Sequence, residues 1–124
     1  MRLHAIAFAI LLAPVPAVAQ DPVKADSKHY KVVYEDSTIR VLRLNFGPRE
    51  KSVMHEHPNG MCAIFLTEFH GKDTTDDGKV TTNDFKPGDV SCEAVKPGLT
   101  RHLPENNGDK PHELIVIERK QRGN

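Results

Sequence analysis

The chain has 124 residues, and its 17 basic and 17 acidic side chains give a formal net charge of zero at pH 7. This balance gives no electrostatic reason to expect a nucleic acid or an anionic membrane as a partner. The length is that of one small domain, whose single hydrophobic core is marginal. Closed β structure, a metal ion, a disulfide or a second subunit would each add stability.

The first 19 residues have the pattern of a secretory signal peptide. Met1-Arg2 is a positive start, Ala5–Leu12 is an unbroken apolar run, and Ala17-Val18-Ala19 is an A-x-A cleavage site. A membrane anchor is the alternative, but the run is too short to cross about 30 Å of hydrocarbon and two prolines interrupt it. We therefore expect cleavage before Gln20 and a periplasmic or secreted protein that has no membrane association. Only Arg2 among the charged residues is lost, which leaves a net charge of −1.

Beyond the signal peptide, the chain alternates between strand-like and turn-like stretches. Residues 20–29 are mostly polar and predict a flexible lead-in, and residues 121–124 predict a tail. Between them, runs of β-branched and aromatic residues are separated by Pro, Gly, Asn and Asp, and no window has a convincing 3.6-residue period. The expected strands are Tyr30–Tyr34, Ile39–Phe46, Val53–His57, Cys62–Leu66, Phe69–Thr74, Val80–Phe85, Asp89–Val95, Arg101–Asn106 and Leu114–Ile117. This pattern predicts one all-β domain over residues 30–120, either a sandwich or a barrel.

His55 and His57 lie two positions apart in one of these expected strands. Side chains alternate between the two faces of a strand, so both imidazoles should share a face, roughly 6.6 Å apart at about 3.3 Å per residue. Neutral imidazole is a common ligand of iron, zinc, copper and nickel, so the pair is a candidate metal site. The alternative is two polar residues on a solvent-exposed face. His29 and His112 are predicted to be surface residues, as is His70 unless its strand bends inward to complete the site.

Cys62 and Cys92 are the two cysteines of the chain. An even count in an exported protein permits one disulfide, and both residues lie in expected strands that could be neighbours. Two buried free thiols are the alternative, and the sequence leaves the choice open.

Two sets of motifs along the domain carry a family resemblance. The first set runs from Glu35-Asp36-Ser37 to His55-Glu56-His57-Pro58 and Phe65-Leu66-Thr67, and the second includes Lys86-Pro87-Gly88-Asp89-Val90 and His102-Leu103-Pro104-Glu105-Asn106. On these motifs the chain resembles a small single-domain cupin of the type 2 conserved-barrel family. The resemblance implies a double-stranded β-helix, or jelly-roll, barrel with a pocket at one end.

The resemblance also implies a metal site. The first cupin motif supplies His-x-His and, four residues later, a glutamate, and the second supplies a histidine followed four residues later by an asparagine. His55, His57, His102 and Asn106 match, but Met61 stands where the glutamate is expected. This implies three histidines around a divalent ion (Fe, Zn, Ni, Cu or Mn, with Mn disfavoured by the lost carboxylate), and Met61 filling apolar space. Asn106 either orients His102 through a hydrogen bond or is a turn residue.

Three functions remain open at this point. The first is a metal-dependent enzyme acting on a small molecule, of the dioxygenase or isomerase type by family analogy. The second is a metal-free, non-catalytic module that binds a small molecule, since many cupins have lost their metal. The third is a structural role through homodimer contacts between edge strands. The sequence places no carboxylate on the histidine face and identifies no catalytic residue, so it does not decide between them.

Overall fold

The structure, a computed structural model, describes residues 20–94 and 101–120. The expected signal peptide, the tail at 121–124 and Val95 at the end of one expected strand lie outside the described residues. The described elements are α1 (Pro22–Ala25), β1 (Tyr30–Glu35), β2 (Ile39–Phe46), β3 (Met61–Phe65), β4 (Phe69–Thr75), β5 (Val80–Phe85), β6 (Val90–Glu93), β7 (His102–Asn106) and β8 (His112–Arg119).

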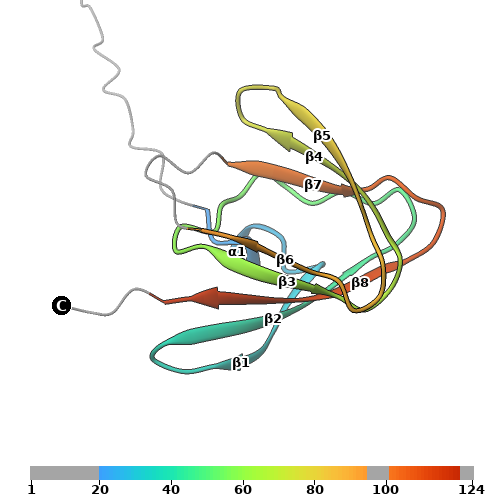
Figure 1. Ribbon diagram of the computed structural model, residues 1–124. Coiled ribbons are helices and arrows are strands. Elements are labelled where there is room, and N and C mark those ends of the chain that lie inside the picture. The colour runs from blue at the N-terminus through green and yellow to red at the C-terminus, as the bar shows by residue number, and fades with distance from the viewer. Residues whose placement is uncertain (1–19, 95–100, 121–124) are drawn as a thin grey trace, which may run out of the picture.

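These strands form two antiparallel sheets, which confirms the all-β prediction. The larger sheet has the strand order β1-β2-β8-β3-β6 and the smaller has the order β5-β4-β7. Figure 1 shows the smaller sheet above the larger one, with the two sheets facing each other. No described helix is long and apolar enough to cross a membrane.

The core lies on the inner face of the larger sheet. Every second residue is buried in β8 and, from Leu42 onward, in β2; the buried residues include Leu42, Leu44, Leu114 and Val116. These positions alternate because successive side chains of a strand point to opposite faces. Aromatic rings complete the core toward the smaller sheet, where the rings of Phe65 and Phe85 stack with centroids 4.0 Å apart.

One expected strand is not a strand. Residues 53–57 make only an isolated bridge at His55, which pairs with His102, and Lys51 just before them bridges to Glu105. The buried residues here are Ser52, just before this segment, and His55 and His57 within it; they are spaced by three and then by two positions. A regular strand cannot turn residues at that spacing to one face, so the segment connects β2 to β3 as an irregular arm.

The segment 20–29, expected to be a flexible lead-in, contains a short helix and buried residues. Asp21 caps α1 by accepting a hydrogen bond from the Val23 backbone N–H at 2.8 Å, and Pro22 occupies the first turn and is buried. Asp and Pro at these positions are a recognised start signal for a helix, which the overall polarity of the segment concealed. His29, expected at the surface, is buried and stacks on Phe46 with ring centroids 4.3 Å apart.

The question left open for the cysteines has an answer in the structure. Cys62 of β3 and Cys92 of β6 are direct register partners and form a disulfide. The bond joins the edge strand β6 to the sheet.

Candidate metal centre

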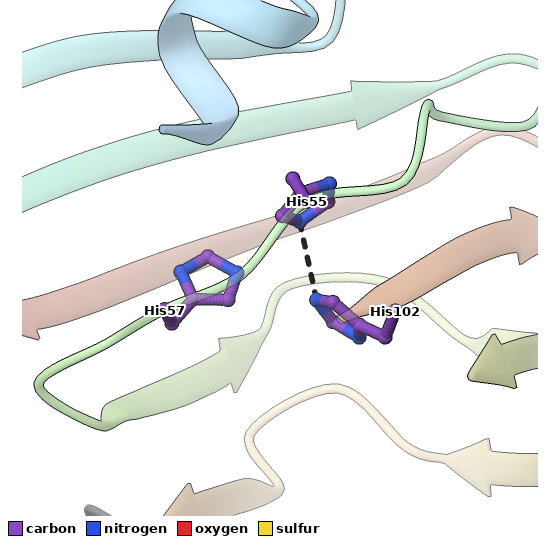
Figure 2. A group of neighbouring side chains, drawn as sticks. All are labelled: His55, His57 and His102. Carbon is purple, nitrogen blue, oxygen red and sulfur yellow. Dashed lines mark hydrogen bonds between the residues drawn. The ribbon is translucent and has the colours of Figure 1, made fainter. Parts of the chain in front are cut away.

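The structure brings His55, His57 and His102 together, as Figure 2 shows. One ring nitrogen from each histidine lies within 4.8 Å of the others. His55 and His57 come from the arm between β2 and β3, and His102 begins β7. The backbones of His55 and His102 exchange two hydrogen bonds of 2.9 and 2.8 Å, which holds the arm against β7. His55 and His57 are buried and His102 is partly exposed.

Each imidazole is oriented by an acceptor at its Nδ1 atom. The three Nδ1 atoms lie 2.8 Å from the Val53 carbonyl oxygen (His55), 2.5 Å from Glu118 Oε1 (His57) and 3.1 Å from Asp73 Oδ2 (His102). Carbonyl and carboxylate oxygens only accept hydrogen bonds, so each Nδ1 is the protonated nitrogen. The lone pair of each histidine is therefore on Nε2.

In neutral rings these Nε2 atoms carry no proton, and two of them lie close together. The Nε2 atoms of His55 and His102 are 3.1 Å apart. Two lone pairs at this separation repel each other, and a cation placed between them removes the repulsion. Nitrogen ligands about 2.0–2.1 Å from one ion are roughly 3.0–3.4 Å apart, so the spacing of the His55–His102 pair fits a shared metal ion. An oriented Nδ1–H and a free Nε2 are also the usual state of metal-bound histidine.

The ionisation of the site agrees with this arrangement. Burial, followed by the repulsion that a positive charge on His102 or His57 would exert, lowers the pKa of His55 to about 3, so its ring is neutral. Burial pushes the pKa of Glu118 upward, but hydrogen bonds from His57 and Arg40 outweigh this effect and hold the pKa below its usual range. Glu118 is therefore an ionised acceptor for His57. Arg40 Nε lies 2.7 Å from the second oxygen of Glu118 and balances its charge.

Sequence reasoning missed both carboxylates. Glu118 had a signal, because it continues the alternation of buried residues in β8 through Leu114 and Val116. Asp73 had none, because its contact with His102 depends on the pairing of β4 with β7. Asp73 also has a buried Oδ1 atom without a hydrogen-bond partner among the described residues, and it faces the same pocket as His102.

Tyr30 of β1 is a further residue at the site that the sequence did not indicate. Its hydroxyl lies 3.1 Å from Nε2 of His55, and its ring meets the His55 ring edge-on with centroids 5.0 Å apart. Burial raises the pKa of this hydroxyl well above its usual value, so Tyr30 is a neutral phenol.

Asn106 does not orient His102, which corrects one of the two interpretations of this residue. Its Nδ2 donates to the carbonyls of Gly47 at 3.0 Å and Lys110 at 2.7 Å, and its Oδ1 accepts from the Gly108 backbone N–H at 2.8 Å. Asn106 is therefore a turn residue. The side chain that orients His102 is Asp73, not Asn106.

The other singled-out residues lie outside the centre. Met61 is partly buried, packs against the core and lines the barrel pocket. His112, expected at the surface, is buried and accepts a hydrogen bond from the His70 backbone N–H. His70 is exposed and its Nδ1 lies 2.6 Å from Asp84, so it does not complete the site.

A pocket of about 210 Å³ opens from the histidines into the barrel. Most of its lining is apolar and includes Phe65 and Phe85. Its polar lining residues are Tyr30, His57, Asp73, Asn83, Ser91, Glu93 and His102. A larger hollow of about 410 Å³ lies on the other side of His57. Arg40 and Glu118 in that hollow already pair with each other, so the barrel pocket is the better candidate for a ligand.

Comparison with known proteins supports the fold. No protein-family model and no curated protein matches the chain. Among solved structures, a cupin domain from Bordetella pertussis Tohama I is 20% identical, with a TM-score of 0.65 over 74% of this chain and 92% of its own. An RmlC-like cupin family protein from Methanocaldococcus jannaschii is 13% identical, with a TM-score of 0.60 over 89% and 95%. A cupin 2 conserved barrel domain protein from Salinispora arenicola is 18% identical, with a TM-score of 0.54 over 89% and 88%. With two facing antiparallel sheets and these structural matches, the chain has the cupin fold, a double-stranded β-helix.

Proposed function

We propose that this protein binds one divalent transition-metal ion through His55, His57 and His102 and acts on a small molecule held beside it in the barrel. The observation that carries the proposal is the cluster of three histidines, in which one ring nitrogen of each lies within 4.8 Å of the others and every Nδ1 has an oxygen acceptor. Three neutral imidazoles favour Fe, Zn, Ni or Cu over Mn, because no carboxylate ligand completes the set.

Such an ion would supply a Lewis acid, or a site for dioxygen if it is iron. Three histidine ligands would leave at least one coordination position for water or the small molecule, as in three-ligand catalytic sites. Asp73 and Glu118 hold two of the rings in one tautomer. The unpaired Asp73 Oδ1 offers an acceptor to a hydroxyl or amino group of the small molecule.

The size and chemistry of the pocket limit what it holds. A dry cavity of about 150 Å³ accommodates benzene, so about 210 Å³ fits a molecule of one ring or a short branched chain. The apolar walls favour a compact apolar body, and the histidine end favours one or two polar groups. The expected signal peptide and the disulfide fit an exported location, which we include in the proposal.

A metal-free binding module is the second candidate, and Met61 in place of the motif glutamate favours it. In that case the barrel pocket binds its ligand without an ion. Metal content of protein made without a histidine tag decides between the two candidates.

The test is metal analysis joined to thermal unfolding. We expect about one ion per chain after loading with Fe, Zn, Ni, Cu or Co, and a Tm that rises with free metal, because a ligand bound only by the folded state stabilises it. His57→Ala should abolish the Tm shift, whereas His70→Ala, which removes an exposed histidine, should keep it. No stoichiometric metal and no Tm shift with any of these ions would contradict the proposed centre.

A further inference from the structure

We infer that the Tyr30 hydroxyl is the hydrogen-bond donor for the small molecule at the three-histidine centre, and that this molecule presents an anionic oxygen, nitrogen or sulfur atom there. The inference rests on the proposed metal site. It adds a residue from β1, outside the histidine motifs, to the groups that select the ligand.

The first step is the position of the hydroxyl. Tyr30 is only 2% exposed. Its ring packs edge-on against the ring of Phe46, with centroids 6.1 Å apart, and edge-on against the ring of His55. Its hydroxyl lies 3.1 Å from the His55 Nε2 atom, the same lone pair that an ion would use. Tyr30 also lines the barrel pocket together with His57 and His102. The hydroxyl is therefore next to the centre, and Tyr30 borders the pocket that a ligand would occupy.

The hydroxyl proton of Tyr30 needs an acceptor other than His55 when an ion is bound. Once the His55 lone pair is taken by an ion, Tyr30 has to donate its proton to another acceptor, because a buried unpaired hydroxyl is costly. Among the described residues, the hydroxyl of Tyr30 has a hydrogen-bond contact only with His55 Nε2, and nearby Ser52 donates its own proton to Asp26 Oδ2 at 2.7 Å. The Ser52 oxygen is neutral, whereas hydrogen bonds to an anionic atom are roughly twice as strong. An anionic atom at the centre therefore competes successfully for the Tyr30 proton.

The third step is the rigidity of this corner. Asp26 accepts the Ser52 proton and lies 2.6 Å from His29 Nδ1, and His29 Nε2 lies 3.0 Å from Glu50. This network joins the N-terminal segment to the arm that carries His55. It fixes both ends of the Tyr30–His55 contact, so the donor is in place before a ligand arrives.

The experiment uses azide as the anion and Co²⁺ as the metal, because Co²⁺ absorbs visible light and reports changes in its ligands. Wild type, Tyr30→Phe and Tyr34→Phe are loaded with Co²⁺ and titrated with azide. We expect Tyr30→Phe to bind Co²⁺ within about threefold of wild type, and its azide dissociation constant to rise about ten- to hundredfold, the usual cost of losing a hydrogen bond to a charged group. Tyr34, whose exposed hydroxyl bonds Asp36, is the matched control and should leave both constants unchanged.

Each other outcome has a defined meaning. An unchanged azide constant in a Co²⁺-loaded Tyr30→Phe protein overturns the inference and leaves the metal site intact. A large loss of Co²⁺ affinity in that variant overturns it too, because Tyr30 would then be a metal ligand. Wild type that binds Co²⁺ but no azide likewise overturns it, whereas wild type that binds no Co²⁺ overturns the proposed function and, with it, the inference. Far-UV circular dichroism verifies that the variant, which keeps the ring shape, is folded.

Discussion

At the scale of single residues, the acceptors beside the histidines matter as much as the histidines themselves. A histidine pair two positions apart is compatible with many surfaces, but an acceptor at each Nδ1 leaves one lone pair per ring and sets its direction. Asp73 does this for His102 from the neighbouring strand β4. Its carboxylate would also place a negative charge beside an ion bound by the three histidines.

Asp73→Asn tests this role. The amide keeps the size of the side chain but loses its charge, so we expect metal affinity to fall about 10- to 100-fold, as for other partners of metal-bound histidine. Competition with a chromophoric chelator measures the affinity. Asp84→Asn is the control, since Asp84 holds the exposed His70 in the same way. Equal affinities in the two variants would argue that Asp73 has no part in the site.

The buried histidines also make the metal-free protein sensitive to acid. Burial and the neighbouring His102 and His57 lower the pKa of His55 to about 3, from an ordinary value of 6.5. Below pH 6.5 the His55 ring binds a proton in the unfolded chain but stays neutral in the folded protein. The free energy of unfolding is therefore greatest above pH 6.5 and falls as the pH falls toward 3. Between about pH 6.5 and 5, before most carboxylates titrate, we expect a loss of about 1 kcal/mol per pH unit. Urea unfolding of the apo protein measures the slope, which His55→Gln should reduce.

At the scale of elements, the turn between β7 and β8 depends on one side chain. Asn106 is 1% exposed and hydrogen-bonds to the backbone at Gly47, Lys110 and Gly108. It therefore ties the end of β7 both to its own turn and to the end of β2. These backbone groups would lose their partner together if the side chain were removed.

Asn106→Ala should lower the free energy of unfolding by about 2–3 kcal/mol, because several buried backbone groups lose their partners at once. Metal affinity per folded molecule should change little, since Asn106 does not touch His102. Urea unfolding and chelator competition measure the two quantities. Asn107→Ala, at the exposed neighbouring position, is the control. A selective loss of metal affinity in Asn106→Ala would restore the discarded role beside His102.

At the scale of the whole molecule, the disulfide closes a large loop. Cys62 and Cys92 are 30 residues apart, and the chain between them includes all of β4 and β5. The bond thus reduces the number of conformations open to the unfolded chain across the β4–β5 hairpin of the smaller sheet. It also joins the two ends of this stretch within the larger sheet. A domain of this size gains much from such a constraint.

The double substitution Cys62→Ser with Cys92→Ser should lower the free energy of unfolding by about 3–4 kcal/mol on the chain-entropy estimate for this loop length. Chemical unfolding compares it with the oxidised wild type, and reduced wild type should resemble the double variant. A stability that is the same with and without reductant would show that the bond contributes nothing.

Much of the secondary structure was predictable from the sequence. The bounds of Ile39–Phe46 and Val80–Phe85 agree with β2 and β5, because alternation and turn residues act within a few positions. The prediction failed at residues 53–57, which make only an isolated bridge at His55. Ser52, just before them, is buried together with His55 and His57, and this spacing breaks the two-residue period of a strand. At residues 20–29 the polar composition did not reveal the short helix α1 or the burial of His29, which stacks on the distant Phe46.

By itself, the sequence determined the all-β class, the turns and the histidine pair, because these depend on residues close together in the chain. Only the tertiary structure decided the chemistry of the centre. The acceptor for His57 is 61 residues away on β8, the acceptor for His102 is 29 residues away on β4, and the hydroxyl beside His55 is 25 residues away on β1. No local pattern encodes these pairings, since they exist only once the two sheets have folded against each other.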